Sequence, residues 1–388
     1  GDDNQGGDDN QGGDDNQGGS EPSSEDSSSS ETSAPAGSAA AAWEGFDGSN
    51  NTLAQAVSTA LAALSDEQRE EALTVLAPEA APAVQQTSVE TTNQVFGAVG
   101  TRLSGGAVAA ARQGASSGDN FFEKAAVWVQ GLFNKSKLDD RKGAKGFESK
   151  TYGTALGLEK QLNNEVKAGI GYAYSNTDID GYKRDTDVDT HTAILYGEYK
   201  PSNWFVNGIV TYGWSDYSEK KNVAGIGVKA DWDAETLGLQ AMTGYEMNLG
   251  GYGVTPELGL RYVHIKQKGY TDTVGQKVSS NNSDVWTGVI GTKVAKTWTL
   301  DNGTMLTPEL KVAATYDISH DDVTSTVTLA NGNVYNVKGK ALDRFGVELG
   351  AGLTAELNDN VELSLGYEGK FRDDYEDHTG LLNLKYKF

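Results

Sequence analysis

The nucleophile and histidine content of this sequence limits the chemistry that it could support. It has no cysteine, which excludes a thiol nucleophile, a disulfide framework and a cysteine-ligated zinc or iron–sulfur site. Its four histidines are His191, His264, His320 and His378. No two of them have the spacing that places two metal ligands on one face of a helix. A G-x-S-x-G match at residues 114–118 lies in a Gly- and Ser-rich stretch instead of a strand–turn–helix elbow, so we interpret it as chance.

Two of the histidines could in principle serve a hydrolase site on the protein surface. His264 lies near the predicted end of a strand, and His320 is followed by two aspartates. No nucleophile accompanies them, so solvated loop residues are the simpler interpretation. The sequence also lacks phosphate-binding loops and dinucleotide fingerprints. We therefore predict no catalytic residue, no metal site and no cofactor.

Charge and hydropathy exclude further classes of protein. The 388 residues carry 32 Lys and Arg against 55 Asp and Glu, a net charge of −23, which argues against nucleic acid as a partner. Mean hydropathy is −0.50, and no stretch approaches the roughly 18 consecutive apolar residues of a membrane helix. A membrane β-barrel is still allowed, because its alternating strands average out as polar. The chain starts at Gly1 without a signal peptide, so we expect a fragment or a processed product.

Residues 1–50 are predicted to be a disordered acidic linker. The hexapeptide GDDNQG occurs three times over residues 1–18, and a Ser-, Glu- and Pro-rich run follows. Such a segment buries too little apolar surface to offset the entropy of ordering it. The repeat partly resembles a calcium-binding loop, but Gly13 stands where that loop needs a bidentate Glu. A plain linker is therefore the better interpretation.

Residues 51–120 are predicted to be a helical linker. Thr52–Leu64 is Ala- and Leu-rich, and Ser65 with Gln68 forms a capping box before a second short helix. A third helix is predicted over about residues 82–103, and its middle is small and polar. A helix that is polar nearly all round needs wet surroundings. At 1.5 Å per residue it would span about 33 Å, roughly the thickness of a bilayer core.

From residue 121 onward the sequence alternates between apolar and polar residues with a period of two, which is typical of β-strands. We predict twelve strands, at residues 125–135, 151–161, 166–176, 188–199, 204–216, 228–247, 252–266, 284–298, 304–318, 342–357, 361–371 and 379–388. Short turns alternate with longer polar loops, among them 177–187, 217–227, 267–283 and 319–341. An even strand number with this loop pattern is typical of outer-membrane barrels.

The predicted fold is all-β, a twelve-stranded antiparallel transmembrane β-barrel with an N-terminal α-helix in the lumen. Aromatic residues near strand ends would form the interfacial girdles. They are Tyr172, Tyr174, Trp204, Tyr212, Trp214, Tyr262, Trp286, Trp298, Tyr316, Tyr367, Tyr386 and Phe388. The Gly-rich opposite face would leave open, watery space inside the ring. The predicted lumen-facing charged residues are Arg344, Glu348, Glu356, Glu257 and Glu309. A soluble β-sandwich also alternates, but it does not need the regular loop alternation.

Two stretches of this sequence resemble known outer-membrane proteins. The final strand, HTGLLNLKYKF, resembles the C-terminal assembly signature of Gram-negative barrels, here Leu382, Leu384, Tyr386 and Phe388. The order of a polar helix, VWVQGLF, TYGTALGLEKQL, further strands and a terminal Phe resembles the translocator unit of monomeric type V autotransporters. The resemblance extends over about Ser65–Phe388.

The resemblance implies an outer-membrane location, with the linker at the cell surface or in the pore. The partners it implies are outer-membrane lipid, the barrel-assembly machinery and an N-terminal passenger that is absent from this chain, and it implies a monomer. Some relatives cleave themselves in the lumen through an Asn of the helix, for which Asn93 is the candidate here. A polar helix surface is the simpler interpretation of Asn93.

Two functions of different classes remain. One is export and surface anchoring of a passenger; the other is a porin, an adhesin or a barrel enzyme that acts through its own extracellular loops. The position of the helix at residues 82–103 discriminates between them, because only a translocator needs it inside the barrel.

Overall fold

The computed structural model describes residues 35–78, 81–103, 125–141, 145–320, 324–339 and 341–388. The predicted linker of residues 1–50 therefore lies outside the described residues as far as residue 34. Its remainder differs from the prediction, because helix α1 (Pro35–Trp43) occupies it and Trp43 and Phe46 are both buried. The composition argument missed α1 because it averaged a Ser- and Glu-rich run with the Ala-rich segment that follows.

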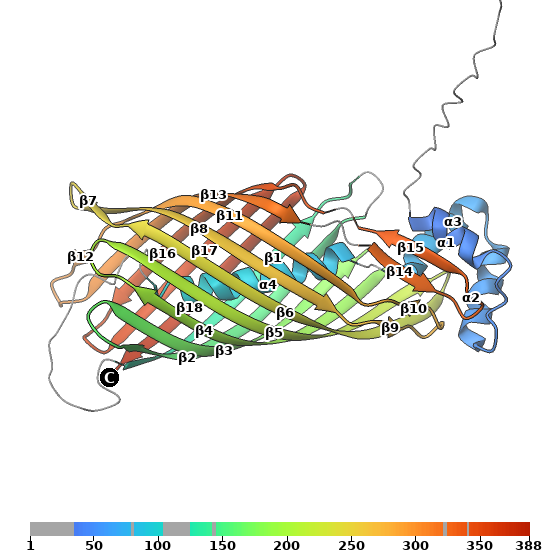
Figure 1. Cartoon of the computed structure of the whole chain (residues 1–388), viewed down its shortest axis with the longest axis horizontal. Helices are drawn as coiled ribbons and strands as arrows, with labels where there is room; N and C mark the ends of the chain where they lie inside the picture. The colour runs from blue at the N-terminus through green and yellow to red at the C-terminus, as the bar shows by residue number, and fades with distance from the viewer. Residues whose placement is uncertain (1–34, 79–80, 104–124, 142–144, 321–323, 340) are drawn as a thin grey trace, which may run out of the picture. The chain divides into compact units, whose positions relative to one another are not determined.

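Twelve long antiparallel strands dominate the described residues from 125 onward (Figure 1). They are β1 (Ala125–Leu138), β2 (Phe147–Gln161), β3 (Val166–Gly181), β4 (Arg184–Tyr199), β5 (Trp204–Val223), β6 (Ile226–Tyr245), β8 (Tyr252–Gln267), β11 (Asn281–Ala295), β13 (Met305–His320), β16 (Phe345–Glu356), β17 (Val361–Arg372) and β18 (Tyr375–Lys387). Each strand pairs with the next in this order, and β18 pairs with β1, from Lys387 opposite Ala126 to Tyr375 opposite Leu138. The ring is closed, as a sheet in lipid requires, and the predicted twelve-stranded barrel is confirmed.

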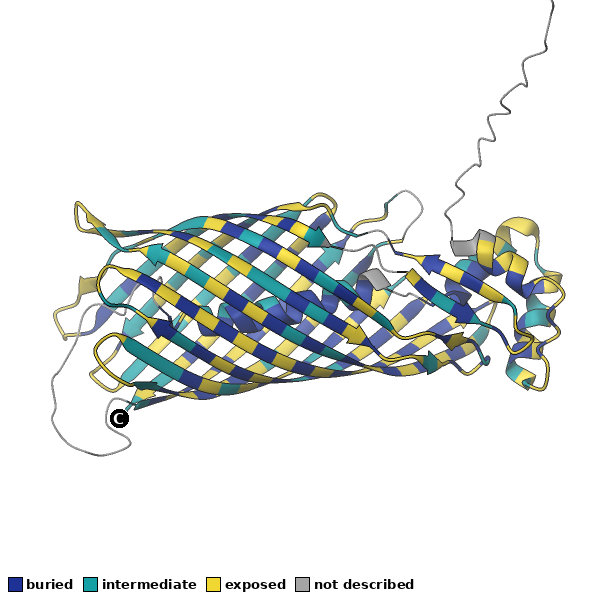
Figure 2. Cartoon of the chain, viewed as in Figure 1, coloured by how far each residue is buried: buried dark blue, intermediate teal, exposed yellow. Residues whose placement is uncertain are grey.

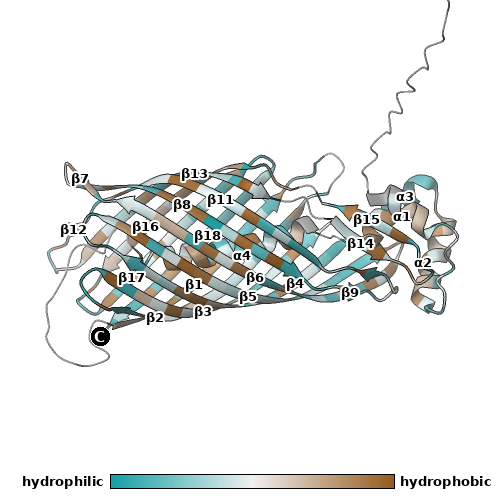
Figure 3. Cartoon of the chain, viewed as in Figure 1, coloured by the Kyte–Doolittle hydropathy of each residue, from teal (hydrophilic) through white to brown (hydrophobic). Residues whose placement is uncertain are grey.

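Alternation along the strands separates an apolar exterior from a packed interior (Figures 2 and 3). Ile170, Leu258, Ile290 and Leu310 point outward and are 58–64% exposed, which fits contact with hydrocarbon chains. Of the twelve predicted girdle residues, all are exposed except Tyr262, which is half-buried. Two short strands, β7 (Met247–Leu249) and β12 (Trp298–Thr299), extend the short turns at one end of the barrel.

The strands at the other end are longer than predicted. Residues 177–187 and 217–227, predicted as loops, are mostly strand, because β3 and β4 meet around Tyr182 and β5 and β6 meet at Ala224. Ala224 and Gly225 both have positive φ (51° and 87°), as the tight turn of a hairpin with native twist requires. The outward-facing residues of these strands become polar here, although the strand pairing continues. The prediction therefore assigned these polar strand ends to loops.

Residues 267–283 and 319–341, which were also predicted as long loops, contribute a second, four-stranded sheet. Its strands are β9 (Tyr270–Thr271), β10 (Lys277–Val278), β14 (Thr324–Thr328) and β15 (Val334–Lys338), in the order β15-β14-β10-β9. Helices α1, α2 (Thr52–Ala63) and α3 (Asp66–Leu76) pack their apolar side chains against this sheet and the tip of the β5–β6 hairpin. The predicted capping box is present: Ser65 and Gln68 begin α3 with reciprocal hydrogen bonds.

Helix α4 (Ala81–Gly100) lies inside the barrel (Figure 1). Its position agrees with the helix predicted over about residues 82–103. Among the described residues, no helix is both long and apolar enough to cross a membrane.

Candidate functional site in the barrel lumen

Helix α4 packs against one side of the lumen. At the end of α4 that lies nearer the short turns, the apolar residues Val95, Phe96 and Val99, with Leu103 just beyond, are at most 2% exposed. They contact inward side chains of the first five strands, namely Trp128, Ala155, Ala173, Ile194, Tyr196 and Ile209. Apolar contact therefore fixes the helix off-centre, against the wall formed by β1–β5.

Polar contacts hold the middle of α4. Glu90 is the single charged residue in the helix, and its carboxylate lies 2.8 Å from the ammonium of Lys370 on β17. Gln86 donates a hydrogen bond to Glu90 (3.0 Å), and the hydroxyls of Ser88 and Tyr217 lie 3.1 Å apart. Because both ends of the Glu90–Lys370 pair are nearly buried, each charge depends on the other for compensation.

This pairing makes a testable prediction. Lys370→Met should lower the temperature at which the heat-modifiable gel band of the folded barrel is lost, because it leaves Glu90 without its partner at a cost of about 3 kcal/mol. Adding Glu90→Gln should restore much of the loss, since the uncompensated charge is then gone. A double variant as unstable as Lys370→Met would show that the pair does not hold the helix.

Arg102 anchors the inner end of the helix. Its guanidinium lies 3.9 Å from the centre of the Trp128 ring and donates a hydrogen bond to the side-chain amide oxygen of Asn383 on β18. The ammonium of Lys167, on β3, donates a hydrogen bond to the backbone oxygen of Arg102. Trp128 in turn donates to the hydroxyl of Tyr196 at 2.8 Å. The chain is thus held at the end of the barrel that carries the short turns.

The part of the lumen nearer the long hairpins is apolar, which corrects the prediction of a watery interior throughout. A buried cluster there joins α4 to the long hairpins; its members are Ala83, Val84, Leu138, Phe147, Ile179, Val188, Tyr217, Ala230, Trp232, Ala234 and Tyr375. Tyr217 and Trp232 stack at 5.2 Å, and Trp232 and Tyr270 at 4.8 Å. The prediction missed this cluster because several of its members were assigned to polar loops.

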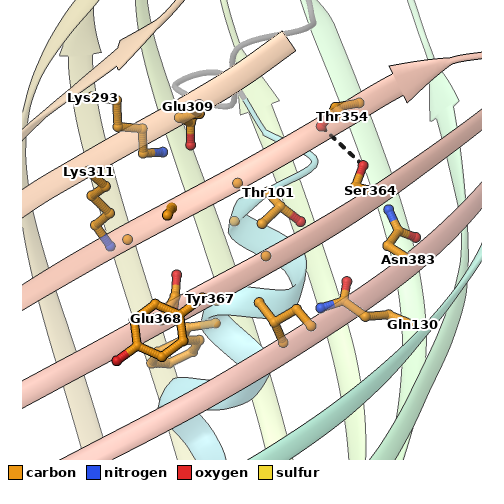
Figure 4. Close-up of a pocket in the computed structure, with 18 of the residues that line it drawn as sticks. Thr101, Gln130, Lys293, Glu309, Lys311, Thr354, Ser364, Tyr367, Glu368 and Asn383 are labelled. Atoms are coloured by element: carbon orange, nitrogen blue, oxygen red, sulfur yellow. Dashed lines mark hydrogen bonds between the residues drawn. The ribbon is translucent and has the colours of Figure 1, made fainter. Parts of the chain in front are cut away.

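A cavity of about 140 Å³ lies on the other side of α4, toward strands β8–β18 (Figure 4). Asn93 and Gly97 of the helix line it. Figure 4 shows Lys293, Glu309 and Lys311 on the strands around the end of α4. Charges of both signs line this part of the lumen, so it provides the wet surroundings that the polar helix face needs.

Four of the five residues predicted as lumen-facing charges form ion pairs or line the cavity. Glu348 is buried and binds Arg261 and Lys311 (2.5 and 3.1 Å). Glu257 lies 3.1 Å from Lys293, Glu356 lies 3.5 Å from Lys387, and Glu309 lines the cavity.

Arg344 does not follow the prediction. It precedes β16, is exposed, and donates a hydrogen bond to the backbone oxygen of Ile318 (3.1 Å). The alternation that predicts an inward side chain holds only within a paired strand, and β16 begins at Phe345.

Asn93 is half-buried and faces the cavity, beside Gly97 and Glu368. A Cβ at Gly97 would come within 2.8 Å of the Glu368 carboxylate, so an acid approaches the helix one turn from Asn93. Self-cleavage at Asn93 stays a prediction. If it occurs, Asn93→Ala should abolish a cleaved product that mass spectrometry detects in cells; an unchanged product mass would remove Asn93 as the candidate.

The other candidate chemical groups do not meet at one place. His191 and His378 lie on the barrel exterior among aromatic rings, where their Nδ1 atoms approach the hydroxyls of Tyr172 and Tyr367. His264 lies 2.9 Å from Asp284. The side chain of His320 and the G-x-S-x-G match at residues 114–118 lie outside the described residues. No group of three or more His, Asp or Glu residues in the described part of the chain could hold a metal ion.

The C-terminal strand completes the ring. Leu382, Leu384, Tyr386 and Phe388 are 45–55% exposed on the lipid-facing side. The backbone N–H of Phe388 donates to the carbonyl of Ala125 (3.0 Å), at the start of β1. We predict that Phe388→Ser reduces the yield of heat-modifiable barrel in membranes, with Ser364→Ala, on the inner face of β17, as the control. Normal yield of the Phe388 variant would contradict a role in assembly.

Comparisons with known proteins agree on the family of this fold. Residues 127–368 match the family model described as "Autotransporter beta-domain". The chain is 23% identical over 272 residues to an extracellular serine protease of Serratia marcescens, which covers 68% of this chain and 26% of that protein. It is 24% identical over 306 residues to outer membrane protein B of Rickettsia rickettsii, with coverage of 73% and 18%. The chain thus spans about a quarter or less of the length of these relatives.

Among solved structures, the barrel resembles the translocator domain of the autotransporter NalP from Neisseria meningitidis. The TM-score is 0.64 at 15% sequence identity, and the match covers 80% of this chain and all of that one. At this identity the likeness concerns the fold alone.

Proposed function

This chain belongs to the autotransporter beta-domain family, and we propose that it exports a passenger joined to its N-terminus through the barrel and anchors it at the cell surface. It is an outer-membrane translocator. The partners in this proposal are outer-membrane lipid, the barrel-assembly machinery and the passenger, and the translocator acts as a monomer. The Serratia relative is named for a protease, but this chain aligns with only 26% of that protein, so we assign no enzymatic activity to this chain.

The path of α4 is the observation that carries the proposal. Its first turn packs with Val84 among the long hairpins, and its last residues lie near Lys167 and Asn383, at the end with the short turns. The chain therefore traverses the barrel once before β1 begins. The described residues 38–77 pack at the opposite mouth from the C-terminus, which is the arrangement that export of an N-terminal passenger leaves behind.

A porin, an adhesin or a barrel enzyme acting through its own loops is not favoured. The lumen holds a helix with a paired buried charge, apolar contacts along one face and a stacked cation at its end. Each of these features favours a chain that is retained in the barrel over an open pore.

An epitope tag placed before Gly1 tests the direction of export. We expect antibody to label it on intact cells. As a matched control, the same tag inserted at Asp359, in the short turn between β16 and β17, should be labelled only after the outer membrane is permeabilised. A tag at Gly1 that needs permeabilisation would overturn the proposal.

A further inference from the structure

Residues 38–77, which we name the cap, contain the described side chains of α1 together with α2 and α3, and they dock on the long hairpins of the barrel. The apolar part of this contact is extensive. Trp43, Phe46, Val57, Leu61, Leu73 and Leu76 of the cap share one buried cluster with Val223, Val228, Val274, Val278, Val327, Leu329, Tyr335 and Val337 of the barrel end and its small sheet. This amount of apolar burial indicates that the cap forms a packed interface with the barrel and is not an unpacked linker.

Two buried cations of the barrel, Arg184 and Lys221, bind the C-terminal end of α3. Arg184 donates hydrogen bonds to the backbone oxygens of Val75 and Ala77 (3.0 Å each), and Lys221 donates to that of Leu76 (2.9 Å). The last carbonyls of a helix lack partners within the helix and carry partial negative charge, so cations suit them.

These cations are buried in the barrel and share an acid. Arg184 and Lys221 are 6% and 5% exposed, and both bind Glu219 on the same pair of strands (3.0 and 3.4 Å). Asp272, 7% exposed, also interacts electrostatically with Lys221, so this buried group holds a second acid. The carbonyl end of α3 adds the partial negative charge of its last backbone oxygens to this buried group.

Gln276, between β10 and the preceding turn, contacts two cap helices at once. It is fully buried, and its amide nitrogen donates to the backbone oxygen of Leu76 (3.1 Å) and to Asp272 (2.8 Å). Its amide oxygen accepts a hydrogen bond from the indole of Trp43 (3.3 Å) and one from the hydroxyl of Tyr335. All four hydrogen-bonding positions of the amide are therefore used, two of them by the cap.

The edge of the interface adds contacts to backbone and side chains. Asn51 caps α2 and also donates to the carbonyl of Thr273 (2.9 Å), and Asn333 donates to that of Ala42 (2.8 Å). The Lys183 ammonium donates a hydrogen bond to Glu71 and lowers the pKa of that carboxyl. None of these contacts involves α4, whose own contacts lie along the lumen.

We propose that the long hairpins and the small sheet form a binding site for the cap as a separable helical ligand. The site recognises the carbonyl end of α3 through Arg184, Lys221 and Gln276, and the indole of Trp43. The cap, and with it the chain upstream, then stays bound to the barrel when the backbone between α3 and α4 is cut. This inference does not depend on export, since it concerns only the docked state.

The test uses the full chain with a site-specific protease sequence inserted between Pro78 and Ala81. The protein is purified in detergent, cut to completion and passed over a size-exclusion column. We expect the N-terminal fragment to co-elute with the folded barrel. Separate elution of the fragment from a barrel that keeps its heat-modifiable mobility would overturn the proposal.

Variants identify the site. Trp43→Ala leaves every barrel residue unchanged, and it should release the cut fragment at least tenfold faster while the barrel keeps its heat-modifiable mobility. Gln276→Leu, on the barrel side, should do the same with unchanged heat-modifiable mobility. Lys268→Met is the matched control, because Lys268 pairs with Asp233 and Glu235 of the barrel (3.2 and 3.6 Å). Unchanged release in Trp43→Ala and Gln276→Leu would show that these residues do not form the site.

Discussion

Removing residues 1–120 raises the single-channel conductance of the barrel in planar bilayers severalfold. Helix α4 with its side chains is about 10–12 Å across, and it occupies the lumen beside a cavity of only about 140 Å³. Its removal opens the wet part of the lumen along its whole length. The apolar outer cluster also loses Ala83 and Val84, so Tyr217 and Trp232 no longer pack against a plug.

Two controls separate this effect from misfolding. The truncated barrel should keep heat-modifiable gel mobility, because all twelve strands and their closure are retained. A second truncation that removes residues 1–78 and keeps α4 should conduct far less than the first. Equal currents from the full chain and from the 1–120 truncation would mean that α4 does not plug the pore.

The Gly238→Leu substitution should displace α4 from its seat. Gly238 lies on the inner face of β6, where a Cβ would meet the hydroxyl of Thr211 on β5 and the side chains of Thr92 and Phe96 on the helix, the last two at 2.5 and 3.0 Å. Thr211 is a short side chain on the neighbouring strand, whereas Thr92 and Phe96 belong to α4, and the helix can approach β6 this closely only because Gly238 has no side chain. A leucine would overpack the contact at a cost of about 1–3 kcal/mol, so we expect a lower unfolding temperature and a larger, noisier current.

Gly208→Leu is the matched control for this substitution. Gly208 lies on the neighbouring strand β5 but faces outward, and the nearest atom to a Cβ there is 3.7 Å away. The same side chain is therefore added toward lipid with no contact to α4. Equal effects of the two substitutions would indicate a loss of strand stability in place of helix displacement.

Sequence reasoning located the barrel because two patterns agreed: the alternation of apolar and polar residues along each strand, and the alternation of short turns with long loops. Outward residues such as Ile170 and Leu310 must be apolar in lipid, so the period of two is visible there as alternating hydropathy. Beyond the membrane the same strands carry outward Asp and Lys, as at Asp187 and Lys220, and the signal fades although the pairing continues. For this reason hairpin extensions were predicted as loops.

The candidate site was predicted in part, for a similar reason. Glu348 and Glu257 could be assigned to the lumen from alternation alone, because each sits within a regular strand. Arg184, Lys221 and Gln276 gave no such signal. Their role depends on the end of α3, more than 100 residues away in sequence, and no local pattern reveals that contact.

The length of the β5–β6 hairpin determines how far from the lipid the cap sits. Each strand has 20 residues, about 68 Å of extended chain, whereas about 9–11 tilted residues cross a bilayer. At a tilt near 45° the surplus raises the hairpin tip roughly 20 Å above the hydrocarbon. The cap, which packs against this hairpin tip, is therefore held clear of the hydrocarbon layer instead of lying on it.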